Sequence, residues 1–509
     1  MRRFFFLFSA LALCLTLLSC AHQKPDPNTV IMVIESSPLN LDPRIGTDAQ
    51  SERIGELIFE GLLRRDENFK LQPRLAESWE ISDPLTYLFH LRRGVRFHDG
   101  RPMTSADVKW TLDSMLNGGV RSAKTSAYRY IDRIEAPDDF TVIIRLKEPY
   151  AALLWNLSDG AIGIVPAGSG EELAQHPIGT GPFRFVSQAQ DREVVLERND
   201  QYWGKSAGLA RVRFNVVPDA TTRALELRKG SADVEIDALP GDMVVALARQ
   251  PQLLVERAPG TGYQYLAMNL RDPILKDVRV RQALAYATDR QPILHYLWHD
   301  MARPANSVLP PQSWAYDSHA KVYPYDAAKA RQLLDEAGYP AGPGGVRFHL
   351  TMKTSTDEST RLLCAVLQQQ LRQVGIALDI RSYEFATFYA DVVRGAFQLY
   401  SLRWVGGSNQ DPDIFENAFD SASFAPRRAN RGYYSNPEVD RLIAEARRSV
   451  DLSQRAAAYD RIQEILNEDL PYVNLWWADN VLVHTRRLEN VRLSPDGSYG
   501  FLRDATLAY

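Results

Sequence analysis

The chain is predicted to have an α/β fold, because helix patterns and strand patterns alternate along its whole length. Residues 362–374 have apolar side chains at helical spacing, Gly375 ends this repeat, and alternate residues of 376–380 are apolar. Units of helix, glycine and strand build open layered sheets, whose ligands usually bind in crevices between domains. A chain of 509 residues suggests about three domains.

The same signals predict further elements. Residues 104–117 form an amphipathic helix that begins with Thr104 and Asp107 in the arrangement of a capping box. A second helix is predicted over 326–337, where an aspartate begins the pattern and a glycine follows it. Two strands are predicted where apolar residues alternate, at 142–146 and 212–216.

The first twenty residues predict an export signal with a lipid anchor. Two arginines precede an apolar run that is too short to stay in a bilayer as a spanning helix, and the run ends at Ser19 and Cys20. This ending resembles a bacterial lipobox, in which the cysteine is lipidated and left as the new N-terminus. We expect a signal peptide over 1–19, lipidation at Cys20 and a lipid-anchored tether over 20–27. The alternative is an ordinary signal peptide with a cysteine near its end.

Charge and cysteine content narrow the class of protein. The formal net charge is −4, and removal of the signal with its two arginines makes it −6. This mildly acidic balance gives no electrostatic reason to expect a nucleic-acid partner. No later stretch is apolar enough to span a membrane, so the lipid is the only membrane contact expected. Cys364 is the one cysteine outside the N-terminal segment, so the core must stabilise the exported protein without an intramolecular disulfide.

Motifs for catalysis or metal binding are weak. His295 and His299 have the spacing that holds zinc on one helical face, but Tyr296 stands where an HExxH motif has its glutamate. The two are interpreted as surface histidines near a helix end, with a metal site as the open alternative. The chain has no G-x-S-x-G motif and no phosphate-binding loop. We predict no catalytic residue and no cofactor, and any ATPase must be another chain.

Several sequence blocks resemble the large solute-binding proteins of peptide and nickel ABC importers, family 5 of the extracytoplasmic solute-binding proteins. The blocks are PRLAESWEIS (73–82) with YLFHLRRGVRFHDGRPMTSADV (87–108), GTGPF (179–183) with LERNDQYW (196–203), MNL (268–270) with KDVRVRQALAYATDR (276–290), and YDAAKARQLLDEAGYP (325–340) with LRQVGIALDI (371–380). They extend over nearly the whole mature chain. By their common order and spacing the chain is identified as a member of this family.

The resemblance implies a two-lobed fold of the periplasmic-binding-protein type, with a hinge and an extra domain inserted in the first lobe. By similarity, lobe I comprises 28–63, 176–264 and 479–509, the inserted domain is 64–175, and lobe II is 265–478. The chain would cross between the lobes near 263–267 and again near 475–481. Those crossings are the expected hinge, where a few residues absorb the closure angle.

The resemblance also implies where a ligand binds. In peptide-binding members an extended ligand lies between the lobes and exchanges main-chain hydrogen bonds with protein strands. The matching residues of this chain are Thr47, Asp48, Ala49, Gly262, Tyr263, Arg403, Trp404 and Val405. Trp404 is expected to line the cleft, with a core position as the alternative, and Tyr263 to offer an aromatic wall. Arg403 would pair with a ligand carboxylate, or else form a surface or interlobe salt bridge.

One position departs from the peptide-binding pattern. Peptide binders carry an aspartate three residues after the tryptophan, where it pairs with the ligand ammonium, and this chain has Gly407 there. A buried ammonium without a carboxylate is strongly unfavourable. Either Asp411 or Asp48 substitutes from another direction, or the ligand has no free α-amino group at that place. Asp411 could also simply begin a turn before Pro412.

The predicted function is that of a lipid-anchored, extracytoplasmic substrate-binding protein of an ABC importer. It would capture a small peptide-like solute and deliver it to permease subunits, which separate ATPases drive. One alternative keeps this role for a sugar, an opine-like conjugate or a metal chelate, and a sugar site would need stacked aromatic rings without paired charges. A remote alternative is a secreted hydrolase, which would need a nucleophile or a metal constellation in the cleft. The sequence leaves the ligand open, because the side chains of a cleft come from distant segments.

Overall fold

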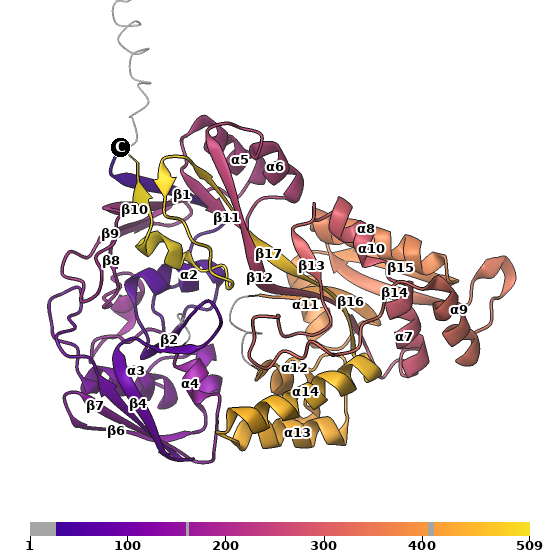
Figure 1. Ribbon diagram of the computed structural model, residues 1–509, viewed down its shortest axis with the longest axis horizontal. Helices are drawn as coiled ribbons and strands as arrows, with labels where there is room; N and C mark the ends of the chain where they lie inside the picture. Colours follow the sequence, from indigo (N-terminus) through magenta and orange to yellow (C-terminus); the bar gives the residue numbers. More distant parts are fainter. Residues whose placement is uncertain (1–26, 159–161, 406–411, 509) are drawn as a thin grey trace, which may run out of the picture.

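The computed structural model describes residues 27–158, 162–405 and 412–508. Most of its strands belong to one long mixed sheet. Their order across the sheet is β15 (Ile376–Tyr383), β14 (Phe348–Ser355), β16 (Leu399–Trp404), β12 (Leu253–Met268), β17 (Tyr472–Thr485), β11 (Val234–Ile236), β1 (Thr29–Ile34), β10 (Arg211–Val216), β9 (Glu193–Arg198) and β8 (Phe183–Ala189). Figure 1 shows two bodies, with β12 and β17 running between them. The predicted two-lobed α/β fold is confirmed.

The long strands β12 and β17 connect the two lobes. They pair antiparallel, and their register shifts between Ala258 and Gly262. Tyr263 pairs with Trp477, so the segments near 263–267 and 475–481 lie side by side in one ribbon. A β-ribbon with an irregular register can bend when only a few backbone dihedral angles change, as a hinge requires.

The first lobe is built on β1 and its neighbours. β1 runs parallel to β10 and β11, whereas β8, β9 and β10 are antiparallel. Its helices are α2 (Ala49–Ile58), α5 (Ala220–Lys229) and α6 (Gly241–Leu247). The alternation predicted for 212–216 is present, because Val212 and Phe214 of β10 are fully buried. The two short strands β18 (Leu488–Glu489) and β19 (Thr506–Leu507) pair near the C-terminus.

A smaller unit with its own core lies below the first lobe in Figure 1. It is formed mostly by residues of the predicted inserted domain 64–175, and its core also includes Leu62 and Leu63. It contains an antiparallel sheet of β4 (Ala76–Asp83), β5 (Thr86–Leu91), β7 (Thr141–Leu146) and β6 (Ile131–Asp138), in that order, beside the pair β2 (Leu63–Arg65) and β3 (Leu71–Pro73). Its helices are α3 (Ser105–Leu116) and α4 (Leu153–Asn156). The predicted cap of α3 is present: the Thr104 backbone N–H donates to the Asp107 carboxylate at 2.7 Å.

The second lobe places helices around β14, β15 and β16. They are α7 (Val278–Ala287), α8 (Arg290–Tyr296), α9 (Ala327–Glu336), α10 (Glu358–Arg372), α11 (Phe385–Val393), α12 (Ile414–Phe419), α13 (Pro437–Arg448) and α14 (Leu452–Asp469), and β13 (Ala302–Pro304) pairs with β17. The helices α9 and α10 and strand β15 confirm the patterns predicted at 326–337, 362–374 and 376–380. Cys364 lies in this lobe's core, where burial raises the pKa of its thiol to about 11.

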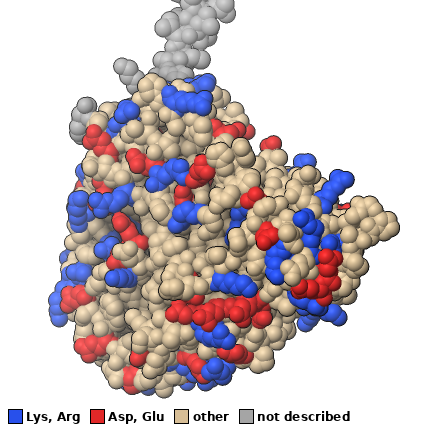
Figure 2. Space-filling view, turned by 45° about the vertical axis from the view of Figure 1, so that its right-hand side comes forward, with Lys and Arg blue, Asp and Glu red and all other residues tan. Residues whose placement is uncertain are grey.

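Basic and acidic side chains are intermixed on the face of the molecule drawn in Figure 2. This agrees with a formal net charge near zero for so long a chain. Among the residues that the structure describes, no helix has both the length and the apolar character needed to cross a bilayer.

Candidate functional site

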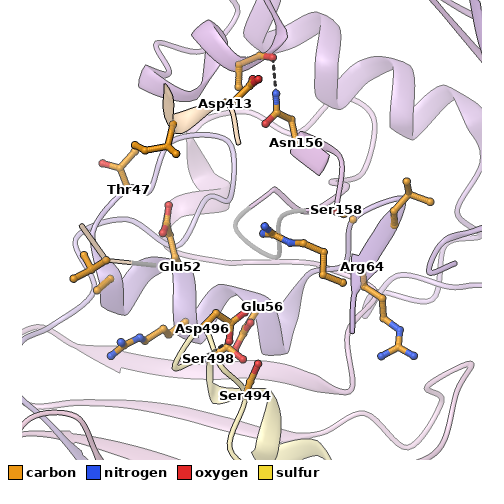
Figure 3. Close-up of a pocket in the computed structure, with 18 of the residues that line it drawn as sticks. Thr47, Glu52, Glu56, Arg64, Asn156, Ser158, Asp413, Ser494, Asp496 and Ser498 are labelled. Atoms are coloured by element: carbon orange, nitrogen blue, oxygen red, sulfur yellow. Dashed lines mark hydrogen bonds between the residues drawn. The ribbon is translucent and has the colours of Figure 1, made fainter. Parts of the chain in front are cut away.

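A cavity of about 1360 Å³ lies between the lobes. It is lined by the loop before α2 and the exposed face of that helix, by parts of 61–158, by parts of 389–431 and by the C-terminal segment 492–504. Figure 3 shows Thr47 and Glu52 on one side, Asn156 and Asp413 together on another, and Glu56, Ser494, Asp496 and Ser498 grouped at the bottom. Four segments far apart in the sequence therefore build one site.

The 64–175 unit and the second lobe touch at the border of this cavity. Arg129 pairs with Glu416 at 2.9 Å, and the Tyr150 hydroxyl donates to the Asp413 carboxylate at 2.6 Å. Asn156 in turn donates to the Tyr150 hydroxyl at 3.1 Å. These contacts hold the two bodies together at a distance from the hinge strands, so the structure has a closed arrangement on this side.

The cavity wall carries charges of both signs and few aromatic rings. Its acidic side chains include Glu52, Glu56, Asp66, Asp413, Glu416 and Asp496, and its basic ones include Arg53, Arg64, Arg129, Arg431, Arg492 and Arg503. Its aromatic side chains are Phe59, Tyr150, Tyr389 and Phe501. Alternating charges of this kind suit a ligand that itself has cationic and anionic groups, because each can be paired when water is excluded.

Glu56 is an acid of the cavity wall whose pKa is strongly raised. Burial raises its pKa to about 7, the Arg503 guanidinium opposes this rise, and the nearby Asp496 carboxylate adds to it. Its Oε1 atom is buried and has no hydrogen-bond partner within the described residues. Near neutral pH this side chain can therefore donate to a ligand when protonated, or accept from one when ionised.

Of the predicted residues at the start of α2, Thr47 and Ala49 line the cavity. Asp48 between them is the N-cap of the helix: its carboxylate accepts from the Ser51 backbone N–H at 2.9 Å and from the Ser51 hydroxyl at 2.5 Å. The same carboxylate also accepts from the Leu39 backbone N–H at 3.3 Å. Both oxygens of Asp48 are thus engaged, which leaves this carboxylate poorly placed to receive a ligand ammonium.

The other predicted residues meet where β12 pairs with β16. Tyr263 lies opposite Trp404, and Val405 beyond β16 lines the cavity. The Tyr263 ring does not form the expected aromatic wall, because it is fully buried in the core of the second lobe. Its hydroxyl donates a hydrogen bond to the Asn474 side-chain oxygen. Trp404 is partly buried and stacks at 6.4 Å on the Tyr265 ring. Its side chain therefore packs against the lobe's core, which was the alternative considered for it.

Arg403 is solvent-exposed and reaches past Gly262: a Cβ atom on Gly262 would lie 3.5 Å from the Arg403 Cδ atom. Burial by surrounding protein lowers the pKa of Arg403, while Asp237 raises it. Among the described residues that line the cavity, Arg403 and Gly262 do not appear, although Val405 two positions after Arg403 does. The remaining predicted residues, Cys20, Gly407 and Asp411, lie outside the described residues.

The histidine pair does not form the motif that a zinc site needs. Helix α8 ends at Tyr296, and His299 lies beyond it with φ +49°. His295 instead faces Asp300, with 3.1 Å between Nδ1 and Oδ2. Within the described ranges, no group of three or more His, Cys, Asp or Glu side chains is arranged to hold a metal ion.

Sequence reasoning missed several residues of the cavity wall. Glu52 and Glu56 are one turn apart on α2, directly after the predicted Thr47, so helical periodicity could have found them. Arg129, Glu416 and the residues of 492–504 carry no such signal, because only the packing of distant segments brings them to the cleft.

Comparisons with known proteins agree with this arrangement. The sequence model of the bacterial extracellular solute-binding proteins, family 5, matches residues 70–426. The glutathione-binding protein GsiB of Pectobacterium atrosepticum is 32% identical over 491 residues, which cover 94% of each chain.

Two solved structures have the same fold. NikZ of Campylobacter jejuni, in complex with Ni(L-His), superposes with a TM-score of 0.82 at 28% identity, covering 94% of this chain and 100% of NikZ. The periplasmic binding protein DppA of Helicobacter pylori, in complex with the peptide STSA, gives a TM-score of 0.79 at 27% identity, covering 94% and 98% of the two chains. The match of the family model over most of the chain and the agreement in fold lead to one conclusion: this chain belongs to family 5 of the bacterial extracellular solute-binding proteins.

Proposed function

We propose that this protein captures a peptide-like solute in the cavity between its lobes and delivers it to the permease of an ABC importer. The observation that carries the proposal is the interlobe cavity of about 1360 Å³ with charged groups of both signs on its wall. A sugar site would rely on aromatic stacking, and only a few rings face this cavity. The protein itself would perform no chemistry, and the permease and its ATPases would be separate chains.

The ligand class proposed is a short peptide of the glutathione type. A relative of this chain, identical at 32% of positions over nearly its full length, is named as a glutathione-binding protein. Glutathione has one ammonium and two carboxylates, so it needs a site with both acidic and basic side chains. The cavity provides both. We also propose the lobe division 28–63, 176–264 and 479–509 for lobe I, 64–175 for the inserted domain and 265–478 for lobe II, with β12 and β17 as the hinge.

The first test is ligand-induced closure. A ligand that contacts both lobes shifts the hinge equilibrium toward the closed form, so glutathione at a hundredfold excess over its Kd should stabilise the fold by about 2.7 kcal/mol. It should also reduce the radius of gyration in solution scattering. Native mass spectrometry of protein purified without refolding should show a retained small peptide. Retention of a metal chelate or a sugar, together with no response to glutathione, would contradict the peptide assignment.

We further propose that Cys20 carries the lipid that anchors the mature protein outside the cytoplasm, with 1–19 as the cleaved signal. Replacing Cys20 with serine should abolish incorporation of labelled fatty acid and leave the precursor without lipoprotein processing, because the thiol is the acyl acceptor. Metabolic labelling of wild type and variant, followed by intact mass measurement, checks this. Wild-type protein that takes up no label would contradict the anchor.

A further inference from the structure

Asp237 and Arg403 come from opposite lobes, and each shifts the pKa of the other across the hinge strands. Asp237 follows β11 and Arg403 lies in β16, and the sheet order places the hinge strands β12 and β17 between these two strands. The Arg403 side chain extends over Gly262 of β12: a Cβ on Gly262 would lie 3.5 Å from the Arg403 Cδ atom and 3.8 Å from the Cβ atom of Ala478, its partner on β17. Among the charges that act on Arg403, Asp237 is the strongest.

These two charged groups lie near each other without a direct ion pair. Within the described residues, the Arg403 guanidinium makes no hydrogen bond and no salt bridge. Asp237 uses Oδ1 to accept from the Val481 backbone N–H at 2.7 Å, and its Oδ2 has no hydrogen-bond donor among the described residues. Both side chains are solvent-exposed, although protein atoms surround them closely. Asp237 and Arg403 thus act on each other electrostatically, while Asp237 Oδ2 and the Arg403 guanidinium have no hydrogen bond within the described residues.

The position of Asp237 is held by the hinge itself. Its φ of +59° lies in the left-handed region, which costs a non-glycine residue about 1 kcal/mol. Two hydrogen bonds with the backbone of Val481 offset this cost: the Asp237 N–H donates to the Val481 carbonyl at 2.9 Å, and the Val481 N–H donates to the Asp237 carboxylate. Val481 belongs to β17, so the carboxylate is fixed to a strand that connects the lobes. Gly497 leaves space on its other side: a Cβ there would lie 3.0 Å from Asp237 Oδ2 and 3.4 Å from Arg53 Nη2.

We propose that Asp237 and Arg403 form a subsite for an α-amino-acid head group, with Asp237 pairing with the ammonium and Arg403 with the carboxylate on the same carbon. This inference rests on the proposed function and specifies one end of its ligand. The γ-glutamyl end of glutathione is such a head group, because its peptide bond is formed through the side-chain carboxylate. An ordinary α-linked peptide lacks it, since its α-carboxylate is consumed in the first peptide bond. Because the two residues belong to different lobes, the head group binds fully only when the lobes close.

The neighbouring charges keep the subsite responsive to pH. Burial raises the pKa of Asp237 to about 6, against the opposing influence of Arg53 of α2 and Arg403 of β16, and Glu35 after β1 adds to the rise. Glu235 of β11 is a further acid beside it, and burial raises its pKa to about 8. Since only ionised Asp237 pairs with an ammonium, affinity should be full above this pKa and should fall as the pH drops through about 6. Asp237→Asn should remove this step, whereas Glu235→Gln should leave it in place.

The decisive experiment is calorimetry with three synthetic probes at pH 7.5. They are glutathione, its analogue without the ammonium (glutaryl-Cys-Gly) and its analogue without the γ-glutamyl carboxylate (4-aminobutanoyl-Cys-Gly). Wild-type protein should bind each analogue about ten- to hundredfold more weakly than glutathione, the loss that follows from one charged hydrogen bond. Asp237→Asn should weaken the binding of glutathione by a similar factor and leave the affinity for the glutaryl analogue unchanged. Arg403→Met should leave the 4-aminobutanoyl analogue unchanged instead.

The matched control is Arg381→Met, since Arg381 is also an exposed arginine on a strand of the second lobe. It should bind all three probes as wild type does. Suppose that wild type binds glutathione, but that the Asp237 and Arg403 variants prefer glutathione over the two analogues as strongly as wild type does. The subsite is then overturned while the proposed function stands, and the same conclusion follows if the variants lose affinity for all three probes equally. If wild type binds none of the probes, the glutathione-type ligand falls and the subsite with it. Melting curves of the ligand-free variants confirm that each is folded.

Discussion

Replacing Glu60 with alanine is expected to destabilise the protein by about 3–5 kcal/mol, the usual cost of removing one partner from a buried ion pair. Glu60 is 3% exposed. Its Oε1 lies 2.5 Å from the Arg74 guanidinium and accepts from the Tyr202 hydroxyl at 2.8 Å. Its Oε2 accepts from the Trp203 indole at 2.7 Å and from the Thr180 hydroxyl at 3.0 Å. The alanine variant would leave a largely buried cation and three donors without this acceptor.

The measurement is thermal and urea unfolding of three variants beside wild type. Glu60→Gln keeps the size and an acceptor oxygen but loses the charge, so it should fall between wild type and Glu60→Ala. Glu67→Ala, an exposed acid seven residues later in the chain, should change the stability by less than about 0.5 kcal/mol. Equal stabilities for Glu60→Ala and Glu67→Ala would show that the network contributes nothing measurable.

Residues of two of the sequence blocks that resemble family 5 take part in the Glu60 network. Thr180 belongs to the GTGPF block, and Tyr202 and Trp203 belong to the LERNDQYW block. The glycines of the first block are required by space, because a Cβ on Gly179 would lie 2.0 Å from the Ile58 carbonyl oxygen at the end of α2. These blocks therefore join the C-terminal end of α2 to the sheet of the first lobe. They stabilise the fold, and the resemblance that they carry predicts the architecture better than it predicts the ligand.

Much of the fold could be predicted from the sequence because its signals are local. The cap of α3 at Thr104 and the strand β15 after Gly375 depend only on residues a few positions apart. Asp48 shows the limit of this reasoning. Its place before the apolar residues Ile54, Leu57 and Ile58 is typical of an N-cap, and the structure gives it that role. The resemblance alone had suggested a ligand contact.

The cavity wall could not be predicted in the same way. Glu416 and Asp496 reach the cleft only after the lobes have packed, and no spacing in the sequence relates them to Glu52 or Arg129. Asp237 is a similar case, because its proposed role in binding depends on Arg403, which lies 166 positions away in the chain. Function of this kind depends on the hinge geometry, which long-range packing determines.

Arg455→Ala is expected to shift the ligand-free protein toward the open form. Arg455 of α14 is 1% exposed, and its guanidinium lies 5.0 Å from the Trp155 ring of α4, 4.9 Å from that of Trp314 and 5.8 Å from that of Tyr459. Trp155 belongs to the 64–175 unit, whereas the other three residues belong to the second lobe. A desolvated cation over an aromatic ring is worth about 2 kcal/mol, and the contact of Arg455 with Trp155 forms only when the two bodies meet.

If closure loses about 2 kcal/mol, the apparent affinity for a ligand that needs the closed form falls about thirtyfold. Solution scattering of the ligand-free variant should give a larger radius of gyration than wild type, and saturating ligand should restore the wild-type value. The control is Arg461→Ala on the same helix, where the arginine is about half exposed and, within the described part of the chain, pairs with Glu438 and Glu464 at the surface. It should alter neither quantity. A lower melting temperature for Arg455→Ala with unchanged affinity and unchanged scattering would mean that α14 and α4 remain packed in both states, so that closure must be governed at the hinge strands alone.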